Sequence, residues 1–291
     1  MLFFLLTLPT ILLSQISPQA DLLSESLKEV TNIPQGITDI EVDEEGNIFL
    51  LEPESHRIYK YFLYSGYDSV LTIGGKGIDE EGFNYPSQIE VQNRQNTYIL
   101  DLMNRRLLLL NTNLKVTKEF NFMELDTQLQ QEEDNDIWPI SFAAGPTGEL
   151  YILNQNDVKV YKLDTYGRLE TSFGGMDYGD GSLDTPDQLV INPGNYLFAG
   201  DTTNQTVTVF DLYGIFQYII HPSTSFRFHR ISILDNYLVC VGKEKLYFEN
   251  LLTRKAGELS PDISSPIIDV EATKNYFYIL QQNKVTIHRY K

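Results

Sequence analysis

One stretch of this chain occurs twice: residues 73–104 recur as residues 173–204, with no insertion or deletion between the copies. The identical positions are Gly74, Gly75, Pro86, Gln88, Asp101 and Asn104, which recur as Gly174, Gly175, Pro186, Gln188, Asp201 and Asn204. Apolar positions match as well, for example Phe83 with Leu183. Self-similarity at a fixed offset is typical of repeat architectures. We therefore expect a fold built from repeated supersecondary units.

The whole chain follows the same rhythm of short apolar runs separated by turns. The middle run of each unit is the clearest, and these runs span residues 47–53, 96–102, 149–155, 196–202, 237–243 and 276–282. The runs are rich in β-branched and aromatic residues, and Gly, Asn or Asp marks the turns between them, as in antiparallel strands. We found no sustained helical periodicity. Six units of about 40–50 residues, each with four antiparallel strands, predict an all-β, six-bladed β-propeller.

The two ends of the chain complement each other. The sixth unit stops after its third strand-like run, at 284–290, and a spare run at 27–33 (LKEVTNI) precedes the first unit. Pairing between them would complete the last blade and remove an exposed strand edge, which is an aggregation hazard. The sequence therefore predicts that an N-terminal strand closes the sixth blade.

Several short motifs recur in the units: a P-x-x-[IL] start, a D-x-x-N after the second run, and a linker containing Gly-Gly. With these motifs, residues 27–291 resemble NHL-type repeats of six-bladed propellers, most closely in the second and fourth units. The first unit departs from the pattern at Glu52 and Ser55, and the third at Asn154 and Asp157. The resemblance implies a propeller and leaves function open, because propellers have many unrelated activities.

The charge balance excludes some classes of partner. The chain has 22 basic and 40 acidic residues, for a net charge of −18. Nucleic-acid binding depends on Lys and Arg that neutralise phosphates, and anionic lipid also attracts basic segments. We therefore expect no nucleic-acid partner and a preference for basic protein surfaces.

The first residues predict export. Residues 2–13 (LFFLLTLPTILL) are apolar, and no charged side chain precedes Asp21. The run is too short to span a bilayer and is typical of the apolar centre of a signal peptide, although Lys and Arg are missing before it. We expect residues 1–20 to be a signal peptide and residues 21–291 to form a periplasmic, outer-membrane-associated or extracellular propeller with no transmembrane span. An uncleaved anchor is the alternative.

Asp101 with Asn104, and Asp201 with Asn204, follow the second run of their units. Short Asx side chains at such places accept hydrogen bonds from nearby backbone N–H groups and hold turns. A catalytic residue is normally needed once, so this recurrence favours a structural role for all four residues.

A metal or catalytic site finds little support in the sequence. Asp39, Glu41, Asp269 and Glu271 lie in first runs and are the candidate ligands of a divalent ion, but acidic residues are abundant enough in this chain to fall there by chance. Propellers that resemble NHL proteins include gluconolactonase-like enzymes, which hold a divalent ion with acidic and amide side chains, and amidating lyases, which bind zinc through histidines. The four histidines here show no H-x-x-x-H or H-E-x-x-H spacing, and no nucleophile motif occurs. We predict no catalytic residue, metal or cofactor.

A long acidic junction is the candidate docking element. Residues 124–137 carry six acidic and no basic side chains, and the only tryptophan follows them. Long loops in compact domains are often functional, and Trp is enriched at interface hot spots. A solvated loop is the alternative. The candidate partner-binding residues are Glu132, Glu133, Asp134, Asp136 and Trp138.

Together these features predict a non-enzymatic, exported propeller that serves as a protein-binding scaffold. Its partner would be an envelope or membrane-complex component, with the chain as an accessory subunit of a bacterial envelope complex. The alternatives are a metal-dependent hydrolase or lactonase-like propeller, and a propeller that binds a small ligand or glycan.

Overall fold

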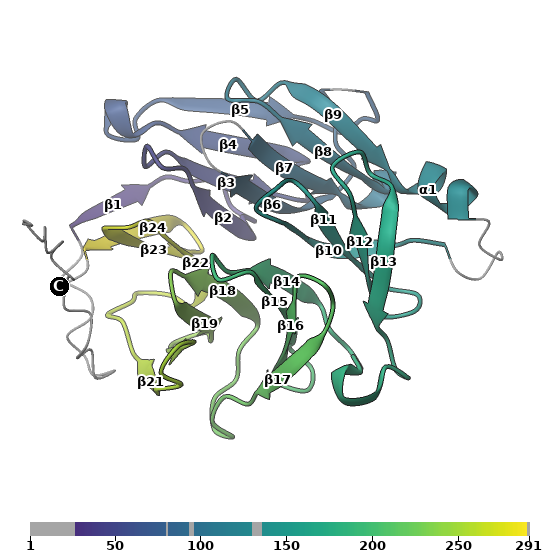
Figure 1. Ribbon diagram of the computed structural model, residues 1–291. Helices are drawn as coiled ribbons and strands as arrows, with labels where there is room; N and C mark the ends of the chain where they lie inside the picture. Colours follow the sequence, from purple (N-terminus) through teal and green to yellow (C-terminus); the bar gives the residue numbers. More distant parts are fainter. Residues whose placement is uncertain (1–26, 80, 93–95, 130–135, 290–291) are drawn as a thin grey trace, which may run out of the picture.

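A computed structural model describes residues 27–79, 81–92, 96–129 and 136–289. These residues form six antiparallel sheets of four strands, arranged like blades around a central axis (Figure 1). The predicted all-β, six-bladed propeller is therefore confirmed.

The strands of each blade follow the chain from the centre outward, except that blade 6 takes its outermost strand from the N-terminal region. Blades 1 to 3 consist of β2 (Asp39–Val42), β3 (Ile48–Glu52), β4 (Arg57–Tyr61) and β5 (Val70–Gly74); β6 (Pro86–Gln92), β7 (Asn96–Asp101), β8 (Arg106–Leu110) and β9 (Val116–Asn121); and β10 (Pro139–Ala144), β11 (Leu150–Asn154), β12 (Lys159–Leu163) and β13 (Leu169–Gly174).

Blades 4 to 6 repeat this arrangement. They consist of β14 (Gln188–Ile191), β15 (Tyr196–Asp201), β16 (Thr206–Asp211) and β17 (Phe216–Ile220); β18 (Arg230–Leu234), β19 (Tyr237–Val241), β20 (Leu246–Asn250) and β21 (Ala256–Leu259); and β22 (Ile267–Ala272), β23 (Tyr276–Gln281), β24 (Lys284–Arg289) and β1 (Lys28–Thr31). The helical elements are η1 (Leu63–Ser65), η2 (Leu102–Asn104), α1 (Phe122–Leu129) and η3 (Gly179–Gly181).

The inner strands β2, β6, β10, β14, β18 and β22 contact one another in a closed ring. Between each pair of adjacent blades lies one cluster of buried apolar side chains. The turns of the up-and-down blades define two faces. Face A carries the turns from the first to the second strand and from the third to the fourth. Face B carries the turns from the second to the third strand and the linkers between blades.

The predicted closure of the sixth blade is confirmed. Strand β1 pairs antiparallel with β24, and Val30 lies opposite Val285. Val30 is buried in the cluster between blades 6 and 1, and Glu29 forms an ion pair with Lys284 at 2.6 Å. The first strand, β1, therefore lies beside the last strand, β24 (Figure 1).

The recurrent Gly-Gly linkers have a steric reason. Gly74 and Gly174 adopt positive φ angles of 95° and 79°. A Cβ at Gly74 would collide with the carbonyl oxygen of His56 and the ring of Phe83. The linker turns sharply against the next blade at these positions, and glycine adopts that backbone without a steric penalty.

One element was not predicted. Residues 122–129, which overlap the start of the acidic junction, form the helix α1. Asn121 caps it, because its side-chain oxygen accepts hydrogen bonds from the N–H groups of Met123 and Glu124 at 3.0 and 3.3 Å. Phe122 and Leu125 are buried between blades 2 and 3. The helix is too short to show a sustained helical period in the sequence. Its cap, Asn121, and the apolar pair Phe122 and Leu125, at positions i and i+3, are the sequence signals that could have predicted it. No helix in the described ranges is long and apolar enough to cross a membrane.

Candidate functional site

Six inner-strand residues at equivalent positions, one from each blade, surround the central channel. We call them the first ring: Asp39, Gln88, Ser141, Gln188, Arg230 and Asp269. The residue after each of them is buried in a cluster between blades, so strand alternation turns the ring residues toward the channel. The recurrence of Gln88 as Gln188 in the sequence repeat is thus a recurrence of this ring position.

Five of the six ring side chains accept a backbone N–H from the inner strand of the next blade. The pairs are Asp39 with Ile89 at 2.9 Å, Gln88 with Phe142 at 3.0 Å, Ser141 with Leu189 at 2.9 Å, Gln188 with Ile231 at 2.7 Å, and Asp269 with Ile40 at 3.2 Å. These hydrogen bonds satisfy buried backbone donors and tie each blade to the next.

Arg230 differs from the other ring residues because a guanidinium has no acceptor. Its Nη2 donates to Asp39 at 2.5 Å and its Nε to Asp269 at 2.9 Å. The Val270 N–H at this junction donates instead to the side chain of Asp269 at 2.8 Å. Burial opposes the charge of Arg230, but the neighbouring Asp269 and Asp39 raise its pKa. Arg230 therefore links blades 5, 6 and 1.

A second layer of the channel, two residues further along three of these strands, consists of the glutamates Glu41, Glu90 and Glu271. Glu41 accepts the Val91 N–H at 3.2 Å, and Glu90 accepts the Ala144 N–H at 3.1 Å. Two of the three glutamates thus accept a backbone N–H from the next blade, as the first-ring residues do. We call these three residues the glutamate trio.

Burial raises the pKa of every member of the trio. It raises the pKa of Glu90 to about 7 and that of Glu271 to about 8. The pKa of Glu41 also lies well above its usual value, because of burial and then of the nearby Glu271 and Asp39. At neutral pH the trio therefore holds protons that ordinary glutamates would have lost.

The sequence grouped Asp39, Glu41, Asp269 and Glu271 as possible ligands of a divalent ion, and the structure brings all four to one channel. Their channel cavity has a volume of about 140 Å³. Among the residues that the structure describes, no three His, Cys, Asp or Glu side chains converge as metal ligands would. The carboxylates bond to peptide groups and to Arg230 instead. The sequence reasoning missed Arg230 and Glu90, which an alignment of the six inner runs would have found.

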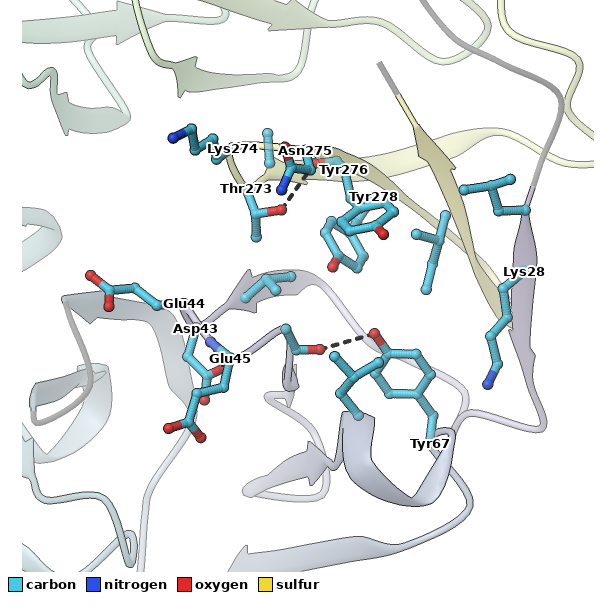
Figure 2. A pocket seen from close by; sticks show the side chains of 16 residues that line it. Lys28, Asp43, Glu44, Glu45, Tyr67, Thr273, Lys274, Asn275, Tyr276 and Tyr278 are labelled. Carbon is cyan, nitrogen blue, oxygen red and sulfur yellow. Dashed lines mark hydrogen bonds between the residues drawn. The ribbon is translucent and has the colours of Figure 1, made fainter. Parts of the chain in front are cut away.

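A second, roomier site lies on face A, between blades 6 and 1. This seam hollow has a volume of about 700 Å³. Figure 2 shows Tyr67, Tyr276 and Tyr278 around it, with Glu44 and Glu45 on the opposite side. The Tyr67 hydroxyl donates to the carbonyl oxygen of Gly46 at 2.9 Å, which fixes the turn that carries the two glutamates (Figure 2).

The predicted turn residues make the contacts that such a role requires. Asp101 is fully buried and accepts hydrogen bonds from the Asn84 N–H and the Asn104 side chain, both at 2.7 Å. Asp201 accepts the N–H groups of Asn204 at 2.7 Å and Thr185 at 3.1 Å. Their contribution to stability stays a prediction.

The docking element predicted from the sequence is described only in part. Glu132, Glu133 and Asp134 lie outside the described residues. Trp138 is 37% exposed, and the guanidinium of Arg105 lies 4.7 Å from its ring centroid. Arg105 also contacts Asp136 at 3.4 Å. A role of Asp136 and Trp138 in partner binding stays a prediction.

Comparisons with known proteins extend only to the fold. No protein-family model matches the sequence, and no curated protein matches it, so the NHL assignment stays a resemblance. Among solved structures, a virginiamycin B lyase from Staphylococcus aureus is similar at 11% identity, with 89% of this chain and 82% of that chain covered and a TM-score of 0.60.

Two other solved structures are similar at the same level. A streptogramin B lyase has 14% identity, with 91% and 87% of the two chains covered and a TM-score of 0.61. A chain of a mitotic checkpoint complex has 9% identity, with 99% and 98% covered and a TM-score of 0.59. Such different proteins share the architecture, so the likeness supports a propeller and leaves activity open.

Proposed function

We propose that this chain is a non-enzymatic propeller that binds another protein. The observation that carries the proposal is the small size of the central channel, which leaves no site for a substrate there. The channel cavity is about 140 Å³ and its polar side chains bond between blades, whereas small-molecule pockets usually measure about 300–1,000 Å³. The seam hollow on face A, at about 700 Å³, has the size of a small-ligand site, so a propeller that binds a small ligand or glycan is an alternative. The propeller chain of the mitotic checkpoint complex is an example of this fold in a protein assembly.

We also propose that the protein acts in a bacterial envelope, as an accessory subunit of a periplasmic or outer-membrane complex. The support is the apolar, uncharged stretch at residues 2–13. The net charge of −18 favours a partner with a basic surface, and such an association weakens with salt.

Affinity purification of the tagged full chain from gently solubilised envelopes tests this proposal. We expect a stoichiometric envelope protein that elutes as salt rises and that rebinds in purified form. Trp138→Ala with Asp136→Ala tests the predicted docking element, and Tyr213→Ala, on an exposed face A turn, is the control. A chain that elutes as a clean monomer without a partner would refute the scaffold.

A metal-dependent hydrolase or a lyase-like enzyme is the second candidate. It is favoured by the raised pKa values of Glu90 and Glu271, because carboxyl groups that keep a proton near neutral pH can serve as general acids. Thermal unfolding with and without calcium, manganese or zinc is the test. A rise of several degrees that Glu41→Gln abolishes would support the enzyme, because a ligand specific to the folded state stabilises it.

A further inference from the structure

The seam hollow lies where the described part of the chain begins. Leu27 and Lys28, the first two described residues, form part of its wall. Strand β24 runs from face B to face A, so its antiparallel partner β1 starts at face A. The Leu27 N–H donates to the Ile287 carbonyl oxygen at 2.8 Å, which holds Leu27 against the last strand. The chain that precedes Leu27 therefore enters from face A, beside the hollow.

Large apolar side chains around the hollow are left exposed by the described residues. Leu27 is 57% exposed, Leu63 46% and Tyr276 38%, although all three line the same space. Tyr67 and Tyr278 also line it and are buried (Figure 2). Apolar and aromatic side chains that gather at one exposed place mark a contact site. The hollow therefore suits an occupant with apolar side chains.

Charge does not select the occupant of this hollow. Its lining carries charged side chains of both signs: Lys28, Lys274, Glu44 and Glu45. Lys28 is engaged within the protein, because its Nζ donates to the Gly66 carbonyl oxygen at 2.5 Å and lies 4.9 Å from the ring centroid of Tyr67. Apolar character and access to the hollow must therefore identify the occupant.

Two leucines of this chain lie within reach of the hollow. Residues 21–26 read Asp-Leu-Leu-Ser-Glu-Ser, so Leu23 precedes Leu27 by four residues. An extended chain covers at most about 3.3–3.6 Å per residue, which allows Leu23 to lie up to about 14 Å from Leu27. This reach exceeds the edge of about 9 Å that a cube of the hollow's volume, about 700 Å³, would have. Residues 21–26 follow the predicted signal peptide, so they stay in the chain when it is removed.

The same segment has an advantage over any separate molecule, because it is tethered to the wall of the hollow. Only residues 24–26 separate Leu23 from Leu27. A short tether gives an effective concentration in the millimolar range. A separate ligand must therefore bind tightly, or be abundant, to compete with the leucines for the hollow.

We propose that residues 21–26 fold back over face A and place Leu22 and Leu23 in the seam hollow. The two leucines pack against Leu63 and the ring of Tyr276 and shield these side chains from water. A small ligand or a partner segment then enters the hollow only by displacing them. This inference goes beyond the proposed protein-binding function, because the contact needs no partner.

Disulfide crosslinking tests the contact. Cys240, the only cysteine, is fully buried, so an engineered pair of cysteines can be followed by itself. Leu23→Cys is combined with Asn275→Cys, whose position belongs to the lining, and an oxidant is added to the native protein. Mass spectrometry of the digested protein measures the crosslink. We expect it to form at least about tenfold faster than in Leu23→Cys with Glu29→Cys, because a docked side chain stays beside its partner.

Glu29 is the matched control position. It is exposed, lies two residues from Leu27 on β1, and does not belong to the lining of the hollow. A segment that does not dock would reach Glu29 at least as readily as Asn275. Equal rates for the two pairs, or no crosslink to position 275, overturn the proposal.

A fluorescent apolar dye, anilinonaphthalene sulfonate, measures how open the hollow is. Leu22→Asp with Leu23→Asp should withdraw the segment, because carboxylates are costly to bury among apolar side chains. We expect the exposed hollow to raise the dye fluorescence at least about twofold. Ser24→Asp with Ser26→Asp adds the same charge to the same segment and should leave the fluorescence unchanged. Circular dichroism confirms that both variants keep the native fold.

Fluorescence that the leucine variant does not raise overturns the contact. A rise in Tyr290→Asp without one in the leucine variant also overturns it, because the other end of the chain would then fill the hollow. Capture of the envelope partner is measured separately. Failure to capture a partner refutes the scaffold and leaves this contact standing, whereas failed crosslinking refutes the contact and leaves the scaffold standing.

Discussion

At the scale of single residues, identical residues at equivalent positions of the sequence repeat make different contacts. Asp101 accepts a hydrogen bond from Nε of the buried Arg106 at 2.8 Å, in addition to its bonds from the turn. Arg106 in turn holds the linker before β6 through the carbonyl oxygens of Ile78, Asp79 and Gly82. Thr206 occupies the place of Arg106 in the repeat, and within the described part of the chain the side-chain partners of Asp201 are Thr185 and Asn204. We therefore expect Asp101 and Asp201 to contribute different amounts to the free energy of unfolding, although they are identical in the repeat.

The first prediction follows from this difference. Asp101→Ala removes the buried partner of Arg106, and breaking a buried ion pair costs about 3–5 kcal/mol. Asp201→Ala removes hydrogen bonds from neutral donors to a carboxylate, for a smaller loss of about 1.5–3 kcal/mol. Urea unfolding followed by circular dichroism measures both free energies. Equal losses of unfolding free energy in the two variants would show that the ion pair between Arg106 and Asp101 adds no stability beyond that of the turn hydrogen bonds.

At the scale of elements, strand β1 decides whether the ring is closed. Without it, β24 would present an unpaired edge and the cluster between blades 6 and 1 would lose Val30. No other blade depends on a segment so far away in the sequence, because β1 and β24 are separated by almost the whole chain. The stability of the entire propeller is therefore sensitive to one short strand.

The second prediction tests this strand. Deletion of residues 27–33 should sharply lower the midpoint of thermal unfolding. Val30→Asp should do so too, because it buries an unpaired charge. Thr31→Asp introduces the same side chain at an exposed position of the same strand and should change the midpoint little. A deleted chain that melts as the full one does would show that the closure contributes no stability.

At the scale of the whole molecule, the channel links stability to pH. Burial raises the pKa of Glu90 to about 7 and that of Glu271 to about 8 in the folded state, while an unfolded glutamate titrates near its ordinary value of 4.5. Between these limits the folded chain binds more protons than the unfolded one. The free energy of unfolding therefore falls as pH rises from about 4.5 to about 8.

The third prediction separates this effect from general charge repulsion. Melting temperatures between pH 5 and pH 8 should decline less steeply when Glu41, Glu90 and Glu271 are all changed to Gln. Changing the exposed Glu54, Glu81 and Glu244 to Gln makes the same three substitutions outside the channel, and the melting temperature of that variant should still decline with pH more steeply than that of the trio variant. Identical slopes in the two triple variants would contradict a role of the glutamate trio.

The sequence by itself determined the architecture. Alternating apolar residues, Gly and Asx turns and the repeat at residues 73–104 and 173–204 act within single blades, so local patterns predict the strands and their number. The spare run at 27–33 and the incomplete last unit predicted closure for the same reason. The short helix α1 was not predicted because eight residues are too few to show a sustained helical period.

Only the tertiary structure decided what the channel residues do. Asp39 meets Ile89, which is 50 residues away, and Asp269 meets Ile40, which is 229 residues away. Such pairs depend on the register between neighbouring blades, which no local pattern encodes. The seam hollow on face A arises in the same way, from turns of blades 6 and 1 that meet only when the ring is closed. Local chemistry therefore specified the blades, and their assembly created the channel and the seam hollow.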